Sequence, residues 1–133
     1  MVQITVPDWI VHRADAESKR STIYTLSVHP DGTRLATGGL DTKVRVWATA
    51  PILDASDNDT PHLLSTLARH TGAVLAVRWS HSGRYLASGS DDTVALIWEL
   101  DETSGGGGFS FGSNEANVET WRPHRRLAGH ESD

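Results

Sequence analysis

The feature that most constrains the fold of this chain is an internal repeat. The segment IYTLSVHPDGTRLATGGLDTKVRVW (23–47) aligns without a gap with VLAVRWSHSGRYLASGSDDTVALIW (74–98), at an offset of 51 residues. The coincident residues include Gly32 and Gly83, Leu35 and Leu86, Asp41 and Asp92, Thr42 and Thr93, and Trp47 and Trp98. Self-similarity at a fixed period is the signature of a repeat protein, in which each unit is one supersecondary structure packed against its neighbours.

Each unit carries the two-residue period of β-strands. In the first unit Tyr24, Leu26 and Val28 alternate with polar residues, which predicts a half-buried strand. The segments 30–32 (PDG) and 81–83 (HSG) follow the first strand of each unit. Their glycines supply the positive φ that a tight hairpin needs. We therefore expect antiparallel hairpins in both units.

Two further strands complete each unit. Third strands are expected at 43–47 and 94–98, each ending on a Trp, and fourth strands at 62–68 and 118–127. Four antiparallel strands per unit, with a His at the seam and a Trp at the end of the third strand, are typical of a β-propeller blade. The sequence thus predicts an all-β protein with about two blades of a propeller.

The expected boundaries follow from the repeat. They are a lead-in strand and insertion at 1–22, a first blade at 23–68 with an acidic loop at 48–61, a second blade at 69–127 with a glycine-rich loop at 100–117, and the start of a third repeat at 128–133. The two loops account for a spacing above the usual ~40–45 residues per repeat.

The last residues resemble the opening of another unit. LAGH (127–130) matches LARH (67–70) at the seam of the second unit. Propellers close a ring with about 4–8 blades, which hides the sheet edges. We therefore expect this chain to be a piece of a longer protein, and the isolated 133 residues to fold marginally and to aggregate.

A buried polar network is expected in the second unit. His70, Ser88, Asp92 and Trp98 can form a chain from the indole N–H through the hydroxyl and the imidazole to the carboxylate. Each such group left buried and unpaired would cost about 1–3 kcal/mol. The predicted role of these four side chains is to hold the blade together.

The first unit carries a similar set. Thr37, Asp41 and Trp47 align with Ser88, Asp92 and Trp98, but the position equivalent to the seam histidine is Lys19. His12 is the best substitute, with the residues that follow it forming an insertion before the first strand. The second expected network is therefore His12, Thr37, Asp41 and Trp47.

A hydrolytic triad of Ser88, His70 and Asp92 is the enzymatic alternative. A catalytic serine needs an exposed position, often on a strained elbow, and an oxyanion hole; Ser88 lies inside an expected strand. The set also recurs once per unit, which suits a structural role. There is no cysteine and no His-x-x-x-His pair, so we expect neither a metal nor another cofactor. The chain is predicted not to be an enzyme.

Charge disfavours direct, sequence-specific DNA binding. Lys and Arg number 12 against 17 Asp and Glu, a net charge of −5, without the basic footprint that nucleic acid requires. No stretch approaches the ~20 apolar residues that cross a bilayer, so no membrane is expected. The one basic cluster, Arg122, Arg125 and Arg126, is either a solvated outer strand or a docking edge for an acidic partner.

The two units resemble WD repeats, although Ala48 and Glu99 follow the tryptophans where that family has Asp. More of the chain is similar to the start of the HIR/HIRA family of histone chaperones. The matching stretches are PDWIVH (7–12), VHPDGTRLATGG (28–39), VRWSHSGRYLASGSDD (77–92) and FGSNEANVETWR (111–122). The last carries the most weight, because a general WD repeat has no reason to contain it.

The resemblance implies a non-catalytic scaffold in the nucleus, with a seven-bladed ring. It implies work in a complex that deposits histones H3 and H4 independently of replication and acts as a transcriptional corepressor. The implied partners are the other subunits of a HIR-type complex, histones H3–H4 through that complex, and a partner histone chaperone that contacts regions absent from this sequence. The alternative is a generic WD-repeat adaptor, such as a ubiquitin-ligase substrate receptor, which would not carry the segment 111–122.

Overall fold

The computed structural model describes residues 9–13, 20–54, 56, 61–101 and 119–128. Most of the predicted glycine-rich loop and of the predicted third repeat lies outside the described residues, as does Lys19. In the described part of the chain no helix is long and apolar enough to cross a membrane.

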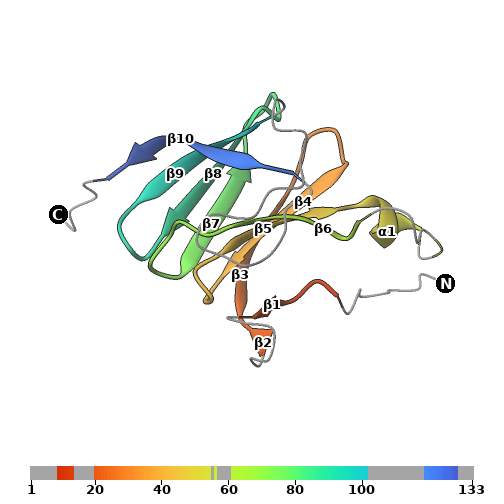
Figure 1. Ribbon diagram of the computed structural model, residues 1–133, viewed down its shortest axis with the longest axis horizontal. Helices are drawn as coiled ribbons and strands as arrows, with labels where there is room; N and C mark the ends of the chain where they lie inside the picture. Colours follow the sequence, from red (N-terminus) through yellow and green to blue (C-terminus); the bar gives the residue numbers. More distant parts are fainter. Residues whose placement is uncertain (1–8, 14–19, 55, 57–60, 102–118, 129–133) are drawn as a thin grey trace.

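Two four-stranded antiparallel sheets dominate the structure (Figure 1). The first sheet contains β3 (Ile23–Val28), β4 (Arg34–Gly39), β5 (Val44–Ala48) and β6 (Leu63–Leu67). The second contains β7 (Val74–Trp79), β8 (Tyr85–Ser90), β9 (Ala95–Leu100) and β10 (Trp121–Leu127). Each sheet is a meander whose spatial order follows the chain. The predicted all-β fold, with four antiparallel strands in each repeat unit, is confirmed.

Smaller elements flank the sheets. The strands β1 (His12–Arg13) and β2 (Arg20–Ser21) form a two-stranded ribbon before the first sheet. The helix α1 (Ala50–Leu53) lies within the segment 48–61 that was predicted as an acidic loop. Pro51 is the second residue of this single turn, where a proline is tolerated because the amide it lacks would have no partner within the helix.

The hairpin turns between the first two strands of each sheet depend on glycine. Gly32 has a φ of +77° and Gly83 a φ of +78°, in the region that side chains rarely adopt. Thr42 and Thr93, in the next turn of each unit, also have positive φ, at 72° and 68°. Because β-branched residues seldom take this conformation, the same strained turn is built twice.

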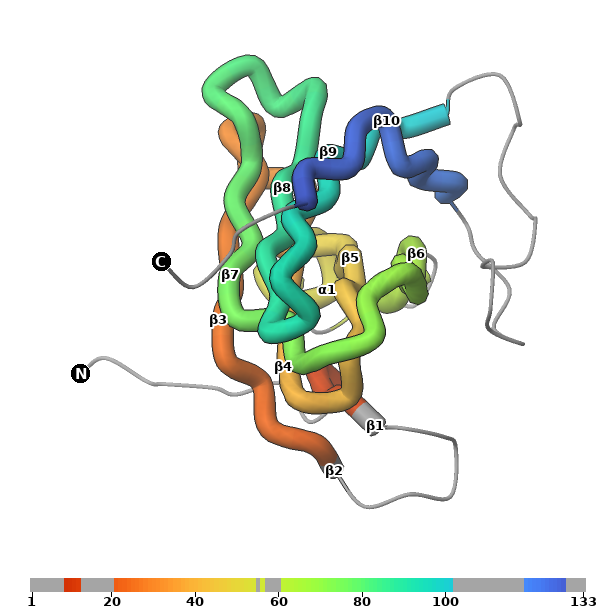
Figure 2. Tube along the Cα trace, turned by 90° about the vertical axis from the view of Figure 1, so that its left-hand side faces the viewer, coloured from red at the N-terminus to blue at the C-terminus, as the bar shows by residue number. Residues whose placement is uncertain are grey.

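The two sheets pack against each other through β7, the edge strand of the second sheet. β7 lies against β3 and β4, as the side-on view shows (Figure 2). Val74 packs so closely on Gly38 that a Cβ at that glycine would overlap the valine side chain. Val74 and Val77 of β7 join one buried cluster with the other sheet's Ala36, Val44, Val46 and Leu67. This apolar contact makes the two blades one packed body.

The apolar face of β3 does not face this core. Tyr24, Leu26 and Val28 are 50%, 59% and 56% exposed. The polar side of the strand faces β7 instead, where the hydroxyl of Thr25 accepts a hydrogen bond from the amide of Val77 at 3.3 Å. The alternation in β3 was predicted correctly, but which of its faces meets the other blade depends on the neighbouring sheet.

Candidate functional site

The second blade holds a chain of four polar side chains. Trp98 Nε1 donates to the Ser88 hydroxyl at 2.9 Å, and that hydroxyl lies 2.8 Å from His70 Nε2. His70 Nδ1 lies 3.1 Å from an Asp92 carboxylate oxygen. With the proton on Nδ1, every donor in the chain has an acceptor. The structure therefore brings together all four residues of the predicted network.

Backbone groups hold the Asp92 end of the network. Burial alone would raise the pKa of Asp92, but hydrogen bonds from the amides of Thr71 and Val94, and the neighbouring His70 ring, outweigh it. The pKa of this carboxyl is therefore lowered from its ordinary value of 3.8. A negatively charged Asp92 is thus favoured in the folded state.

The first blade has the same arrangement, with His12 from β1. His12 Nε2 lies 2.6 Å from the Thr37 hydroxyl, which accepts a hydrogen bond from Trp47 Nε1 at 2.8 Å. His12 Nδ1 lies 2.9 Å from an oxygen of Asp41. His12 and Thr37 are 0% and 1% exposed. The lead-in histidine occupies the place that the seam histidine has in the second blade.

Asp41 is held by more cationic surroundings than Asp92. Burial would raise its pKa, but the His12 ring, the amide of Lys43 and the Arg45 guanidinium together lower it from 3.8. The Arg45 guanidinium lies 3.5 Å from the second carboxylate oxygen. Both Asp residues therefore carry lowered pKa values in the fold.

The geometry around Ser88 does not present a nucleophile. The residue is 1% exposed, and its oxygen already contacts the indole of Trp98 and the ring of His70. A substrate would have to displace the blade core to reach it. Within the described residues, no group of three His, Cys, Asp or Glu side chains could hold a metal ion.

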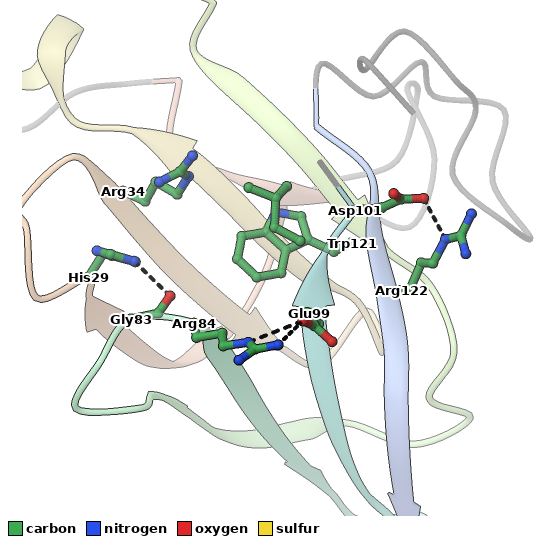
Figure 3. A pocket seen from close by; sticks show the side chains of 9 residues that line it. His29, Arg34, Gly83, Arg84, Glu99, Asp101, Trp121 and Arg122 are labelled. Atoms are coloured by element: carbon green, nitrogen blue, oxygen red, sulfur yellow. Dashed lines mark hydrogen bonds and ion pairs between the residues drawn. The ribbon is translucent and has the colours of Figure 1, made fainter. Parts of the chain in front are cut away.

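A cavity of about 730 Å³ lies between the two blades (Figure 3). It opens at the end where the first hairpin of each blade and the start of β10 meet. The lining residues are His29, Arg34, Gly83, Arg84, Glu99, Leu100, Asp101, Trp121 and Arg122. The sequence does not predict this cavity, because its walls come from segments that are far apart in the chain.

Three aromatic rings pack in a row beside this cavity, and the two outer ones, His29 and Trp121, line it. His29 meets Trp79 edge to face with ring centroids 4.7 Å apart, and Trp79 meets Trp121 at 5.4 Å. Trp79 Nε1 donates to the carbonyl of Ser27 at 2.9 Å, which fixes the middle ring to the first blade. Such edge-to-face pairs are favoured by the ring quadrupoles.

Ion pairs surround the rings. Arg34 binds both carboxylate oxygens of Glu119 through its Nε, at 3.0 and 3.1 Å, and so joins β4 to the segment before β10. The Glu119 hydrogen bond is the largest cause of the raised pKa of Arg34. Arg84 contacts Glu99 at 3.2 Å, and Arg122 Nε lies 2.6 Å from Asp101 (Figure 3).

The three arginines of the predicted docking edge do not line one cavity. Arg122 lines the cavity between the blades, whereas Arg126 lines a second cavity with Arg69 and Asp92. Arg125 lines neither cavity and is exposed. A bulge between Pro123 and Arg125 shifts the register of β10 with β9, so that Arg122 pairs with Glu99 and Arg126 with Leu96, on opposite faces of the sheet.

Comparison with protein families agrees with the repeat. The family described as "WD domain, G-beta repeat" matches residues 12–48 and 61–99, more than half of the chain. The chain belongs to the WD-repeat family. The WD-repeat matches begin at His12 and end at Glu99, so they include both polar networks.

Three similar proteins from other organisms carry the same name. Protein HIR1 of Mycosarcoma maydis is 65% identical over 99% of this chain and 13% of its own length. Protein HIR1 of Cryptococcus neoformans is 52% identical over 99% of the chain and 15% of its own length. Protein hir1 of Schizosaccharomyces pombe is 45% identical over 94% of this chain and 14% of its own length. The resemblance to the HIR family is confirmed, and the chain spans about a seventh of these relatives.

A similar solved structure supports the fold alone. The crystal structure of Saccharomyces cerevisiae Sqt1 matches with a TM-score of 0.55 at 18% sequence identity, over 81% of this chain and 23% of that one. At this identity the likeness shows a shared architecture, because one fold serves many functions.

Proposed function

We propose that this chain is a non-catalytic scaffold region of a HIR-type histone chaperone subunit, acting in the nucleus. The observation that carries the proposal is the 65% identity to Protein HIR1 of Mycosarcoma maydis over 99% of the chain. The proposed roles are replication-independent nucleosome assembly and transcriptional corepression. Its partners would be other subunits of the complex, histones H3–H4 through that complex, and a partner histone chaperone bound by regions outside these residues.

The structure supports a scaffold role in two ways. The polar groups that could suggest catalysis are buried in blade cores, with Ser88 and Thr37 each 1% exposed. The exposed features are blade faces, ion-paired arginines and a cavity between blades, which suit contacts with other proteins. The net charge of −5 disfavours direct contact with DNA phosphates.

The proposal is tested by purifying the protein from its own cells through a tag added to its gene. We expect histones H3 and H4 and further HIR-type subunits to copurify in fixed ratios, and cells with an untagged gene to yield neither. Copurification of ubiquitin-ligase subunits without histones would contradict the proposal and support the generic adaptor.

A second measurement addresses the activity itself. Extracts depleted of the protein should lose nucleosome assembly on DNA that is not replicating, and keep assembly on replicating DNA. Adding back the purified complex should restore the loss. Equal loss in both assays would contradict a replication-independent role.

A further inference from the structure

The first hairpins of the two blades differ at one position of the turn. At the repeat offset of 51 residues, Asp31 of the first unit corresponds to Ser82 of the second. Asp31 Oδ1 accepts hydrogen bonds from the amide and the hydroxyl of Thr33, at 2.9 and 2.6 Å. The Ser82 hydroxyl makes the equivalent contact, because it accepts a hydrogen bond from the amide of Arg84 at 3.3 Å. The repeat thus places a carboxylate in one turn where the other has a hydroxyl.

The first hairpin shows how this turn holds an anion. The pKa of Asp31 is lowered from its ordinary value of 3.8, chiefly by the hydrogen bonds from the side chain and the amide of Thr33. His29 Nδ1 lies 2.7 Å from the same carboxylate oxygen. The donors of this turn therefore converge on a negative group at the position of Asp31.

The second hairpin has a cation where the first has Thr33. Arg84 stands at that position, and its Nε and one terminal nitrogen each lie 3.2 Å from one oxygen of Glu99 (Figure 3). The two side chains are 66% and 31% exposed, and ion pairs as exposed as this one contribute little to stability. The other oxygen of Glu99 lies 3.2 Å from His124 Nδ1. Arg84 can therefore leave Glu99 for a stronger anion without stranding that carboxylate.

Ser82 is also accessible to an enzyme. It is exposed at the tip of the hairpin between β7 and β8, the kind of site where modifying enzymes reach a folded chain. The nearby Ser80 is half-buried, and its hydroxyl accepts a hydrogen bond from the amide of Tyr85 at 3.1 Å. Protein kinases select substrates by patterns of charge, and Arg84 presents a positive charge two residues after Ser82.

We propose that Ser82 is a phosphorylation site, modified by a protein kinase that recognises basic residues. The Ser82 oxygen attacks the γ-phosphorus of ATP, the bond from that phosphorus to the leaving ADP breaks, and the hydroxyl proton passes to a base of the kinase. The new phosphate carries a charge of roughly −1.5 to −2 and three acceptor oxygens. It binds the amide and the guanidinium of Arg84 in place of Glu99, because a charge-assisted bond to phosphate is stronger than the exposed pair. This inference stands whether or not the histone chaperone role is correct.

The first test locates the phosphate in the full-length protein, purified from its own cells through a gene tag with phosphatase inhibitors present. Chymotrypsin should release the peptide SHSGRY (80–85), and fragmentation in the mass spectrometer separates its two serines. We expect one phosphate on Ser82, which phosphatase removes and which is absent from the Ser82→Ala variant. The proposal is overturned if growing, starved and cell-cycle-arrested cells all lack this phosphate, or carry one on Ser80 alone.

The second test asks whether Arg84 is recognised. Arg84→Gln should lower the phosphorylated fraction of Ser82 several-fold. Glu99→Gln is the matched control, because it removes the same ion pair but keeps the arginine; it should leave the phosphorylated fraction unchanged or raise it. Equal fractions in the Arg84→Gln variant and the wild type, or equal losses in both variants, would contradict recognition of Arg84.

The third test concerns the exchange of partners by Arg84. Amide hydrogen exchange of the segment 80–85 is compared in the phosphorylated full-length protein and in the same sample after phosphatase treatment. We expect several-fold slower exchange with the phosphate in place, because the amide of Arg84 then donates to a charged acceptor. The difference should shrink in the Arg84→Gln variant, which lacks the guanidinium. Identical exchange in the two samples would overturn the proposed binding of the phosphate by Arg84.

Discussion

His29 Nε2 donates a hydrogen bond to the carbonyl of Gly83 at 2.9 Å, across the boundary between the two blades. Gly83 is in the left-handed region, and a Cβ there would overlap the His29 ring. Gly32 is its equivalent in the first unit and has the same φ within a degree, but nothing lies within 4 Å of the Cβ position. The repeat thus places one turn in two environments.

Alanine at these two glycines should separate backbone strain from contact with the other blade. Gly32→Ala should lower the free energy of unfolding by about 1–2 kcal/mol, the cost of the left-handed region. Gly83→Ala should cost at least about 1 kcal/mol more, because the His29 ring must move and its hydrogen bond is lost. Urea unfolding of both variants checks this. Equal losses would show that His29 moves away without cost.

Removing the hydroxyl of Ser88 should destabilise the second blade. Ser88→Ala breaks the contact with Trp98 and His70, and should lower the free energy of unfolding by about 1–3 kcal/mol. Ser65→Ala is the matched control, since Ser65 is also 1% exposed but in the described chain its hydroxyl has no partner. That control should change stability by less than about 0.5 kcal/mol. An unchanged Ser88→Ala variant would contradict the structural role and reopen the enzymatic one.

Stability should fall in acid because of Asp41 and Asp92. Their pKa values in the fold lie below 3.8, the ordinary value of the unfolded chain. As pH falls, the unfolded state therefore binds protons before the folded state does. The stabilisation that the two charged carboxylates give the fold is fully present above about pH 4, and it is lost as pH falls through the lower folded pKa values. Thermal unfolding between pH 6 and 2 should show this loss. The Asp92→Asn variant should unfold at a lower temperature than the wild type at pH 6, and its unfolding temperature should depend less steeply on pH. An unchanged pH dependence in this variant would contradict the role of Asp92.

Leu26 and Val77 occupy the same position of the repeat but differ in burial. Val77 is 0% exposed in the core between the sheets, whereas Leu26 is 59% exposed. Val77→Ala should cost about 2 kcal/mol, through lost burial and the cavity left behind. Leu26→Ala should cost less than about 0.5 kcal/mol in this chain. Guanidinium unfolding compares them, and similar costs would mean that the outer face of β3 is covered in solution.

Much of the fold could be predicted because its signals are local. The hairpin glycines Gly32 and Gly83 mark turns by their freedom at positive φ, and the tryptophans Trp47 and Trp98 recur with the hydroxyl residues they bind. One strand boundary differs from the prediction, because β10 begins at Trp121 and not at 118. The end of a strand depends on its pairing partner, here β9, and the residues of one strand do not determine how it pairs with another.

The cavity between the blades could not be predicted in the same way. Arg34 and Glu119 are 85 residues apart, and only the packed sheets bring the two charges together. The arginines of β10 appeared as one basic cluster, but alternation along the strand and the bulge after Pro123 separate Arg122 from Arg126. Nothing in the local sequence signals either outcome.

The sequence by itself determined the repeat, the all-β blades and most members of both polar networks, because these depend on spacing within a unit. The resemblance to the HIR family came from particular stretches of residues, above all 111–122. Only the tertiary structure decided what happens between units. Packing of β7 on β3 buried Val77 and left Leu26 exposed, and it placed the buried Trp121 in the wall of the cavity between the blades. The physical reason is that hydrogen bonds and alternation repeat along the chain, whereas burial depends on which surface the neighbouring sheet covers.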